Sequence, residues 1–376
     1  MNLLPAVLIG GPPNTGKSIL FYSLTRALEK RGLPSFYALR AAPDGEGHWT
    51  QEITPDKRYG LRFKGQWNQR WIDVTCRDLA ARAMPTLVDV GGLPTAEQEV
   101  IFDQCNYAIV LTRASDNAAR EHWRHLMTKH GLPILADMQS DLEGENRYAI
   151  NPDGSVGGTL AGLRRVEGCV ATGPAFEALV ARVHSIFDLH QDDIDGLNLA
   201  SAPKDAQAVD YTALTRRLYG AGARWPESDL DRLVEAAPID FSLAVYGAKP
   251  AWLCTALGAR RNVGYVFDVR QGWVRPPNIS IGLPNDERWQ DNPQLELKIE
   301  WLSERCARLH MKKRADFYYL DYASFDGMVF PYLPNETVLL LNGPMPMWLF
   351  ASLGQAYRHL QGVIGEQAIL GIGKAS

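Results

Sequence analysis

The first residues whose types and spacing suit chemistry form the sequence GPPNTGKS at positions 11–18. It fits the pattern G-x-x-x-x-G-K-[ST], which describes a phosphate-binding loop (P-loop) between a strand and a helix. Glycines let backbone N–H groups face the phosphates, the lysine reaches the β- and γ-phosphates, and the serine hydroxyl holds Mg²⁺. We therefore predict that a nucleoside triphosphate and Mg²⁺ bind at Gly11, Asn14, Thr15, Gly16, Lys17 and Ser18.

Two carboxylates are candidates to complete this site. Asp89 ends an apolar run, where it would either order the Mg²⁺ shell or simply cap a strand, and Gly92 follows at a spacing that suits a backbone contact to the γ-phosphate. Asp44 lies in an acidic, glycine-containing turn, where it could accept a proton from a substrate hydroxyl or be merely solvated. The predicted catalytic residues of this half are Lys17, Asp44 and Asp89, and the predicted metal ligands are Ser18 and Asp89.

These residues need a scaffold, and the surrounding pattern predicts one. Short apolar runs alternate with stretches of helical periodicity from residue 6 to about residue 190. Strands are predicted at 6–9, 35–39, 86–90, 107–112 and 133–136, and helices at 16–31, 74–83, 97–104, 116–130 and 175–189. Buried strands separated by helices indicate an α/β fold with a doubly wound parallel sheet and right-handed crossovers. The acidic and then Ser/Ala/Pro-rich stretch 192–205 is interpreted as a linker.

The second half of the chain contains an internal repeat. Residues 247–258 read GAKPAWLCTALG and residues 343–354 read GPMPMWLFASLG, so both fit G-x-x-P-x-W-L-x-x-x-L-G. Each copy follows an apolar run, continues as a predicted helix and leads into another apolar run, which indicates duplication of one small α/β module. We predict a P-loop domain at 1–190 and two duplicated modules at 205–285 and 313–376.

The repeated turn has a structural and a functional interpretation. The glycines would permit a tight turn, the prolines would open a helix, and the tryptophans would anchor it in a core. The same geometry leaves N–H groups free at a helix N-terminus, which suits a phosphate. The candidate ligand-binding residues are Gly247, Pro250, Trp252, Gly343, Pro346 and Trp348.

Composition narrows the functional classes. The chain has 376 residues, 46% of them hydrophobic and 22% charged, with a net charge of -4, so nothing attracts it globally to duplex nucleic acid or anionic membranes. Its five cysteines are scattered, which argues against a disulfide framework or a structural zinc site. No apolar run approaches the length of a spanning helix, and the N-terminus lacks the basic region of a signal peptide. We therefore expect a cytoplasmic protein without a membrane partner.

The first half resembles the P-loop class that includes signal-recognition GTPases, partition ATPases and small-molecule kinases. The resemblance depends on the P-loop, on Asp89 with Gly92 and on the acidic turn around Asp44, and it covers roughly residues 1–190. It implies nucleoside triphosphate hydrolysis or phosphoryl transfer with Mg²⁺. Because no N/T-K-x-D guanine motif is present, ATP is preferred over GTP as the expected nucleotide.

The second half resembles the small CRISPR-associated ring-nuclease module, which acts on cyclic tetra-adenylate, the second messenger of type III CRISPR systems. The first copy matches best, through Trp252, Leu253, Asp268, Arg270 and Gly272. The second copy matches in 315–317 and 343–353 and then departs from the pattern. The resemblance implies ligand binding by the repeated turns and Arg270, a catalytic role for Asp268, and modules that dimerise around the ring.

One departure from that family concerns its histidines. The family uses histidines on and after this helix, together with the strand-end aspartate, to bind manganese and cleave the ring. Neither copy has a histidine in the corresponding turn of the helix, at 254–259 or 350–355. A pair of modules that binds the ring without cleaving it, or that only pairs with itself, therefore fits as well as a ring nuclease.

The leading functional hypothesis is a P-loop NTPase whose tandem modules bind a cyclic oligoadenylate. Whether the modules also degrade this ligand, and whether the protein forms a homo-oligomer, are left open. One alternative is a small-molecule or nucleotide kinase in which Asp44 acts as base and the second half shapes the acceptor site. Another alternative is a non-enzymatic protein, switched by nucleotide, whose repeats contact another protein.

Overall fold

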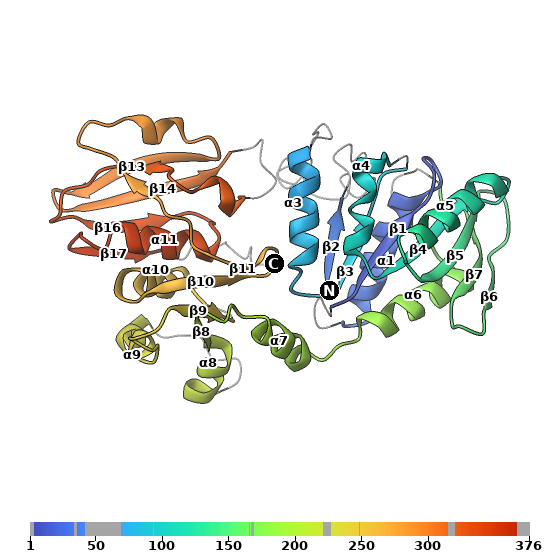
Figure 1. Ribbon diagram of the computed structural model, residues 1–376, viewed down its shortest axis with the longest axis horizontal. Coiled ribbons are helices and arrows are strands. Elements are labelled where there is room, and N and C mark those ends of the chain that lie inside the picture. Colours follow the sequence, from blue (N-terminus) through green and yellow to red (C-terminus); the bar gives the residue numbers. More distant parts are fainter. Residues whose placement is uncertain are drawn as a thin grey trace, which may run out of the picture. The chain divides into compact units, whose positions relative to one another are not determined.

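The structure is a computed structural model that describes residues 4–33, 36–41, 69–92, 94–164, 166, 169–220, 227–247, 249–314 and 320–366. Its contacts divide the chain into two compact units, unit 1 (Met1–Leu197) and unit 2 (Asn198–Ser376). Both units combine a mainly parallel sheet with helices, as the sequence predicts (Figure 1). Each unit is described by itself.

Unit 1 is built on a seven-stranded sheet with the order β2-β3-β1-β4-β5-β7-β6. All neighbouring pairs are parallel except β6 with β7, which form an antiparallel hairpin. The strands are β1 (Ala6–Gly10), β2 (Tyr37–Arg40), β3 (Thr86–Asp89), β4 (Tyr107–Arg113), β5 (Ile134–Asp141), β6 (Arg147–Ile150) and β7 (Val156–Ala161). The helices are α1 (Lys17–Lys30), α3 (Gln69–Ala80), α4 (Ala96–Glu99), α5 (Asn117–Lys129), α6 (Pro174–Phe187) and α7 (Gln191–Ala200).

Helices cover both faces of this sheet, which confirms the doubly wound fold. The central strand β1 shows why, since its side chains alternate between two cores. Val7 and Ile9 pack in one core with α1 and α6, whereas Ala6 and Leu8 pack in another with α3 and α5. A strand that is apolar on both faces is stable only between two helical layers.

Several predicted elements differ from the structure. The predicted helix 97–104 is only α4 followed by a 3-10 turn, Phe102–Gln104. The predicted linker 192–205 does contain the division between the two units, but most of it is helical, because α7 runs through it and buries Ile194 and Asn198. The hairpin of β6 and β7 was not predicted, since β6 is exposed along its whole length and β7 contains two glycines, so neither has a strand-like apolar pattern.

Unit 2 contains two four-stranded sheets and one short two-stranded sheet. The sheet orders are β11-β10-β9-β8, β13-β14-β16-β17 and β12-β15. The strands are β8 (Gln207–Asp210), β9 (Leu243–Tyr246), β10 (Val263–Asp268), β11 (Gly272–Val274), β12 (Ser280–Ile281), β13 (Leu295–Ser303), β14 (Cys306–Lys313), β15 (Val329–Phe330), β16 (Val338–Asn342) and β17 (Gly362–Gly365). The helices are α8 (Tyr211–Tyr219), α9 (Leu230–Glu235), α10 (Ala251–Arg260) and α11 (Met347–Ala356).

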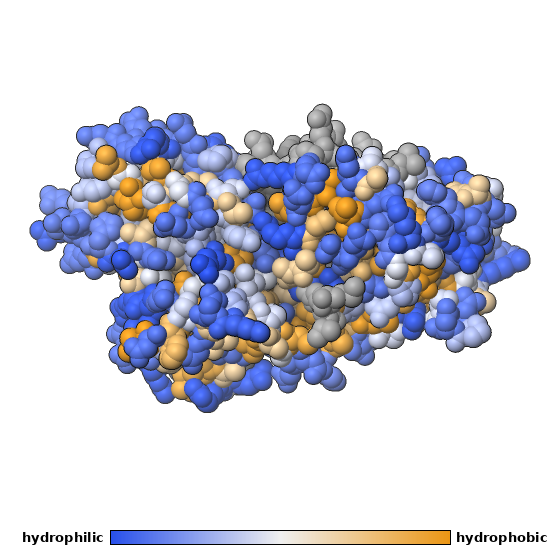
Figure 2. All heavy atoms as spheres, in the orientation of Figure 1, coloured by the Kyte–Doolittle hydropathy of each residue, from blue (hydrophilic) through white to orange (hydrophobic). Residues whose placement is uncertain are grey.

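The sequence repeat corresponds to a structural repeat. In each copy a strand, a glycine turn, a helix and a second parallel strand follow one another, as β9–α10–β10 and as β16–α11–β17. Their buried side chains form one continuous hydrophobic core. The copies differ in their outer strands, since the sheet of the second copy ends in the antiparallel pair β13 and β14. The face of this pair that carries Glu296, Lys298 and Lys312 is exposed. Hydrophilic side chains accordingly predominate there, with a few hydrophobic ones among them (Figure 2).

Helices α10 and α11 of the two copies pack directly against each other. A Cβ atom added to Gly258 would lie 2.1 Å from the carbonyl oxygen of Ala351, and one added to Gly354 would lie 2.1 Å from the carbonyl oxygen of Thr255. Gly258 and Gly354 are the last positions of the two repeats, and Thr255 and Ala351 also occupy equivalent positions. The contact is therefore reciprocal, as at a twofold interface, although both halves belong to one chain.

Candidate nucleotide site and duplicated turns

The P-loop connects the central strand β1 with α1, in the place that its motif requires. β1 lies between β3 and β4, so the loop leaves the carboxyl edge of a parallel sheet next to two further strand ends. Gly11 (φ 149°) and Gly16 (φ 92°) adopt backbone conformations that favour glycine. At Gly11 a Cβ atom would also come 1.9 Å from the carbonyl oxygen of Leu111 on β4, so only glycine fits.

Lys17 lies in the first turn of α1 and is buried. Its Nζ donates hydrogen bonds to the carbonyl oxygens of Gly11 and Pro12, each at 2.7 Å. The hydroxyl of Thr15 donates to the same Pro12 carbonyl at 3.0 Å. The ammonium is thus held inside the curve of the loop, where phosphate oxygens could take over its hydrogen bonds.

The predicted metal ligands, Ser18 and Asp89, come from neighbouring elements. Asp89 is paired with Ile9 at the end of β1 and is buried, while Ser18 begins α1 one residue after Lys17. A buried carboxylate beside a hydroxyl is the oxygen donor set that Mg²⁺ prefers, so these residues fit the ion.

A residue that the sequence analysis did not single out lies at the same place. Arg40 ends β2 and is paired with Asp89. Its Nε lies 3.7 Å from the Asp89 Oδ2 atom, and its Nη2 lies 3.5 Å from the Ser18 hydroxyl. No sequence motif marks this arginine; only the pairing of β2 with β3 brings it to the site.

Gly92 lies directly against the P-loop. A Cβ atom added there would be 2.5 Å from the backbone nitrogen of Pro13 and 2.8 Å from its Cα atom. The chain after β3 therefore contacts the loop in unit 1, as the spacing from Asp89 suggests. Asp44, the remaining predicted catalytic residue of this half, lies outside the described residues.

We expect Gly92→Ala to lower nucleotide affinity about tenfold, because the new methyl group must displace the loop backbone, and overpacking of this kind costs roughly 1–3 kcal/mol. Titration with a fluorescent ATP analogue would measure the effect. Gly196→Ala is the control, since a Cβ atom there meets nothing within 4 Å. Unchanged affinity in Gly92→Ala would show that the loop tolerates the displacement.

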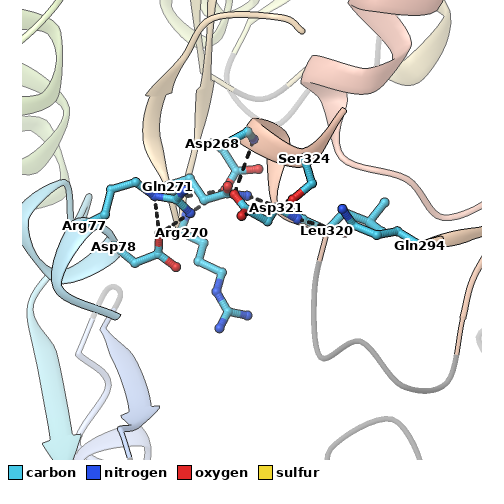
Figure 3. A network of polar contacts seen from close by, with 10 residues as sticks. Arg77, Asp78, Asp268, Arg270, Gln271, Gln294, Leu320, Asp321 and Ser324 are labelled. Carbon is cyan, nitrogen blue, oxygen red and sulfur yellow. Dashed lines mark hydrogen bonds and ion pairs between the residues drawn. The ribbon is translucent and has the colours of Figure 1, made fainter. Parts of the chain in front are cut away.

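In unit 2 the candidate residues of the first copy gather at the carboxyl ends of the parallel strands β8, β9 and β10. The side chain of Asp268, at the end of β10, accepts hydrogen bonds from the backbone N–H groups of Arg270 (2.9 Å) and Gln271 (3.2 Å). Gln271 in turn donates to the carbonyl oxygen of Leu320 at 3.2 Å, which ties this turn to the rest of unit 2 (Figure 3). Asp268 and Arg270 thus belong to one ordered turn.

Two residues that the sequence analysis did not assign lie at the same edge. Lys249, within the repeated turn, donates to the carbonyl oxygens of Gly247 (2.9 Å) and Phe267 (3.2 Å). Burial lowers the pKa of Lys249, although the charges of Asp268 and Asp210 act in the opposite direction. Asp210 ends β8 and caps α8, and it would lie 2.9 Å from a Cβ atom at Gly247. Three parallel strand ends therefore bring an ammonium and two carboxylates together.

The residues that the two repeats share are built into the fold of unit 2. Trp252 and Trp348 are buried in the core, and Trp348 packs edge-to-face on Phe325, as the structural interpretation expects. Pro250 and Pro346 stand directly before α10 and α11. Gly343 (φ 142°) is confined because a Cβ atom would come 2.1 Å from the carbonyl oxygen of Met311.

The second copy lacks the strand-end aspartate, and Glu366 follows its last strand instead. The carboxylate of Glu366 accepts hydrogen bonds from Arg308 Nε and Nη2, both at 3.0 Å, and from Asn342 Nδ2 at 2.9 Å. These bonds hold Glu366 in an ion pair across β14, β16 and β17. The two copies therefore present different chemistry at their strand ends. Residues 315–317, on which part of the resemblance depends, lie outside the described residues.

Two features are absent from the described residues. No group of three or more His, Cys, Asp or Glu residues in them is arranged to hold a metal ion. Within the same residues, every helix is too short or too polar to cross a membrane.

Comparison with known proteins adds little to this description. No family model matches the sequence, and no curated protein matches it. Among solved structures, a GTPase from Pyrococcus abyssi in its apo form is similar at 11% sequence identity, over 37% of this chain and 68% of that one, with a TM-score of 0.24. A TM-score this low adds nothing to the fold assignment, which depends on the strand order and the loop geometry.

Proposed function

We propose that unit 1 is a Mg²⁺-dependent nucleoside triphosphatase, with ATP as the preferred nucleotide. The observation that carries the proposal is the convergence of the P-loop, Lys17 and Asp89 at the ends of adjacent parallel strands. The N-terminus of α1 and the loop N–H groups would bind the phosphates, and Lys17 would pair with the β- and γ-oxygens. Ser18 and Asp89 would hold Mg²⁺, which when bound neutralises charge on the phosphates.

Calorimetric titration with ATP and GTP, each with Mg²⁺, tests this proposal, and measurement of released phosphate tests hydrolysis. Binding of ATP with phosphate release supports the proposal. Loss of ATP only in the presence of an acceptor, without free phosphate, would indicate the kinase alternative instead. If neither nucleotide binds, the proposal is wrong.

We further propose that unit 2 binds a cyclic oligoadenylate, most simply cyclic tetra-adenylate, and that the protein acts in type III CRISPR immunity. The support is the resemblance of the duplicated turns to the ring-nuclease module, together with the reciprocal packing of α10 on α11 within one chain. Lys249, Arg270 and the N-terminus of α10 would contact phosphates at the β8–β10 edge, where Asp268 orders the turn.

We expect Arg270→Gln to weaken binding of cyclic tetra-adenylate about tenfold, because it removes one charge-assisted hydrogen bond to a phosphate. Calorimetry with cyclic oligoadenylates of several sizes would measure this effect and the ring preference. Arg275→Gln is the matched control, since Arg275 is exposed and donates to Tyr265 and Asp205 instead. Chromatography of the cyclic oligoadenylate after incubation with the protein would show whether the ring is cleaved or only bound.

Failure of the wild-type protein to bind any of the rings would contradict the function proposed for unit 2. It would leave the nucleotide site of unit 1 unaffected. A ring that binds and remains intact would indicate that unit 2 senses or sequesters the ligand and does not cleave it.

A further inference from the structure

Arg40 lies at the position where the nucleotide site most needs a positive charge. The Asp89 side chain is only 5% exposed, and a buried carboxylate without a counter-charge is strongly destabilising. Arg40 is paired with Asp89 on the neighbouring strand, and its own side chain is 18% exposed. Its guanidinium reaches both Asp89 and Ser18, the two residues that fit Mg²⁺.

The distances indicate that this guanidinium is only loosely held. The contact to Asp89 Oδ2 is 3.7 Å and the contact to Ser18 Oγ is 3.5 Å, both longer than an optimal charge-assisted hydrogen bond. Within the part of the chain that the structure describes, the buried Nε and Nη1 atoms have no hydrogen-bond partner. An arginine with unused donors beside a phosphate-binding loop is well suited to bind phosphate oxygens.

We propose that Arg40 is an internal counter-ion that occupies the Mg²⁺ position in the nucleotide-free protein and competes with Mg²⁺ when a nucleoside triphosphate binds. A guanidinium and a divalent cation repel each other strongly at distances of a few ångström in a site of low dielectric constant. The Arg40 head group would therefore have to leave Ser18 and Asp89 when Mg²⁺ binds. Without Mg²⁺, the guanidinium stays and supplies positive charge to the triphosphate.

This inference rests on the nucleotide binding proposed for unit 1 and adds a measurable property to it. The expected property is a nucleotide affinity that depends only weakly on Mg²⁺ in the wild-type protein. Removing the charge should make the dependence steeper. Arg40→Gln removes the charge and keeps a hydrogen-bonding side chain, whereas Arg40→Lys keeps the charge.

The experiment titrates a fluorescent ATP analogue into the full chain at a series of Mg²⁺ concentrations, beginning in EDTA. For Arg40→Gln we expect the affinity for the ATP analogue in EDTA to fall about tenfold. The Mg²⁺ concentration at which the affinity has completed half of its increase should fall by a similar factor. Arg40→Lys should remain close to wild type. Thermal unfolding of each variant checks that the fold is retained.

Arg113→Gln is the matched control. Arg113 also ends a strand of the same sheet and contacts the P-loop, through the Asn14 carbonyl oxygen at 3.4 Å. Its hydrogen bonds within the described part of the chain do not involve the predicted Mg²⁺ ligands. The Arg113→Gln variant should change the affinity for the ATP analogue by the same factor at every Mg²⁺ concentration. An unchanged Mg²⁺ midpoint in Arg40→Gln would overturn the inference, whereas absence of any nucleotide binding by the wild type would overturn the function proposed for unit 1.

Discussion

Lys17→Ala is expected to lower the affinity of the protein for ATP and Mg²⁺ about a hundredfold. The Nζ atom lies inside the loop on the Gly11 and Pro12 carbonyl oxygens, and the proposed phosphate contacts would use the same ammonium. Two charge-assisted hydrogen bonds contribute roughly 3 kcal/mol, which corresponds to a factor of about one hundred in affinity. Calorimetry with ATP and Mg²⁺ measures the change directly.

The control for this variant is Lys30→Ala, at the exposed C-terminal end of the same helix. It should bind ATP as the wild type does. Because Lys17→Ala also removes two hydrogen bonds within the loop itself, its unfolding temperature should be compared with that of Lys30→Ala. A Lys17→Ala protein that is folded and binds ATP within threefold of the wild type would refute the assignment of the loop.

Gly258→Ala and Gly354→Ala are each expected to destabilise unit 2 by about 2–3 kcal/mol. In both variants the new methyl group would lie 2.1 Å from a backbone carbonyl oxygen of the opposite helix, so α10 and α11 must separate. Neither neighbour can move like a flexible side chain, because both obstructing atoms belong to helical backbone. Inserting a methyl group into a close helix contact typically lowers the free energy of unfolding by roughly 1–3 kcal/mol.

Calorimetric unfolding measures the effect as a fall of roughly 4–12 °C in the midpoint of unit 2. Gly196→Ala is the control, because it is also a glycine within a helix but has nothing within 4 Å of the added atom. It should be stabilised by up to about 1 kcal/mol through helix propensity. If Gly258→Ala were as stable as Gly196→Ala, the reciprocal helix contact would be wrong.

The double variant Gly258→Ala/Gly354→Ala adds a further check. Both methyl groups would force apart the same pair of helices, so the second substitution should cost less than the first. Fully additive losses would indicate that each glycine is confined separately by its own module.

Local sequence patterns were sufficient to predict the elements whose residues are close together in the sequence. The P-loop is one continuous segment whose glycines and lysine must follow one another, so its position between a strand and a helix could be predicted. The repeat could also be recognised, because each copy carries its turn, proline and tryptophan in one short stretch. The hairpin of β6 and β7 was missed, since the exposed strand β6 is held by its antiparallel pairing with β7 and not by an apolar periodicity of its own. Helix α7 was missed because it buries few residues, among them Ile194 and Asn198.

The P-loop, the strand-end position of Asp89 and the duplication of a strand–turn–helix–strand module could therefore all be predicted from residue types and spacing. The contacts of Arg40 with Ser18 and Asp89 could not, and neither could the shared edge of Lys249, Asp210 and Asp268. One property of parallel sheets explains both cases. A parallel sheet brings together the carboxyl ends of strands that are far apart in the chain, and which ends meet depends on the order of the strands, which no local pattern encodes.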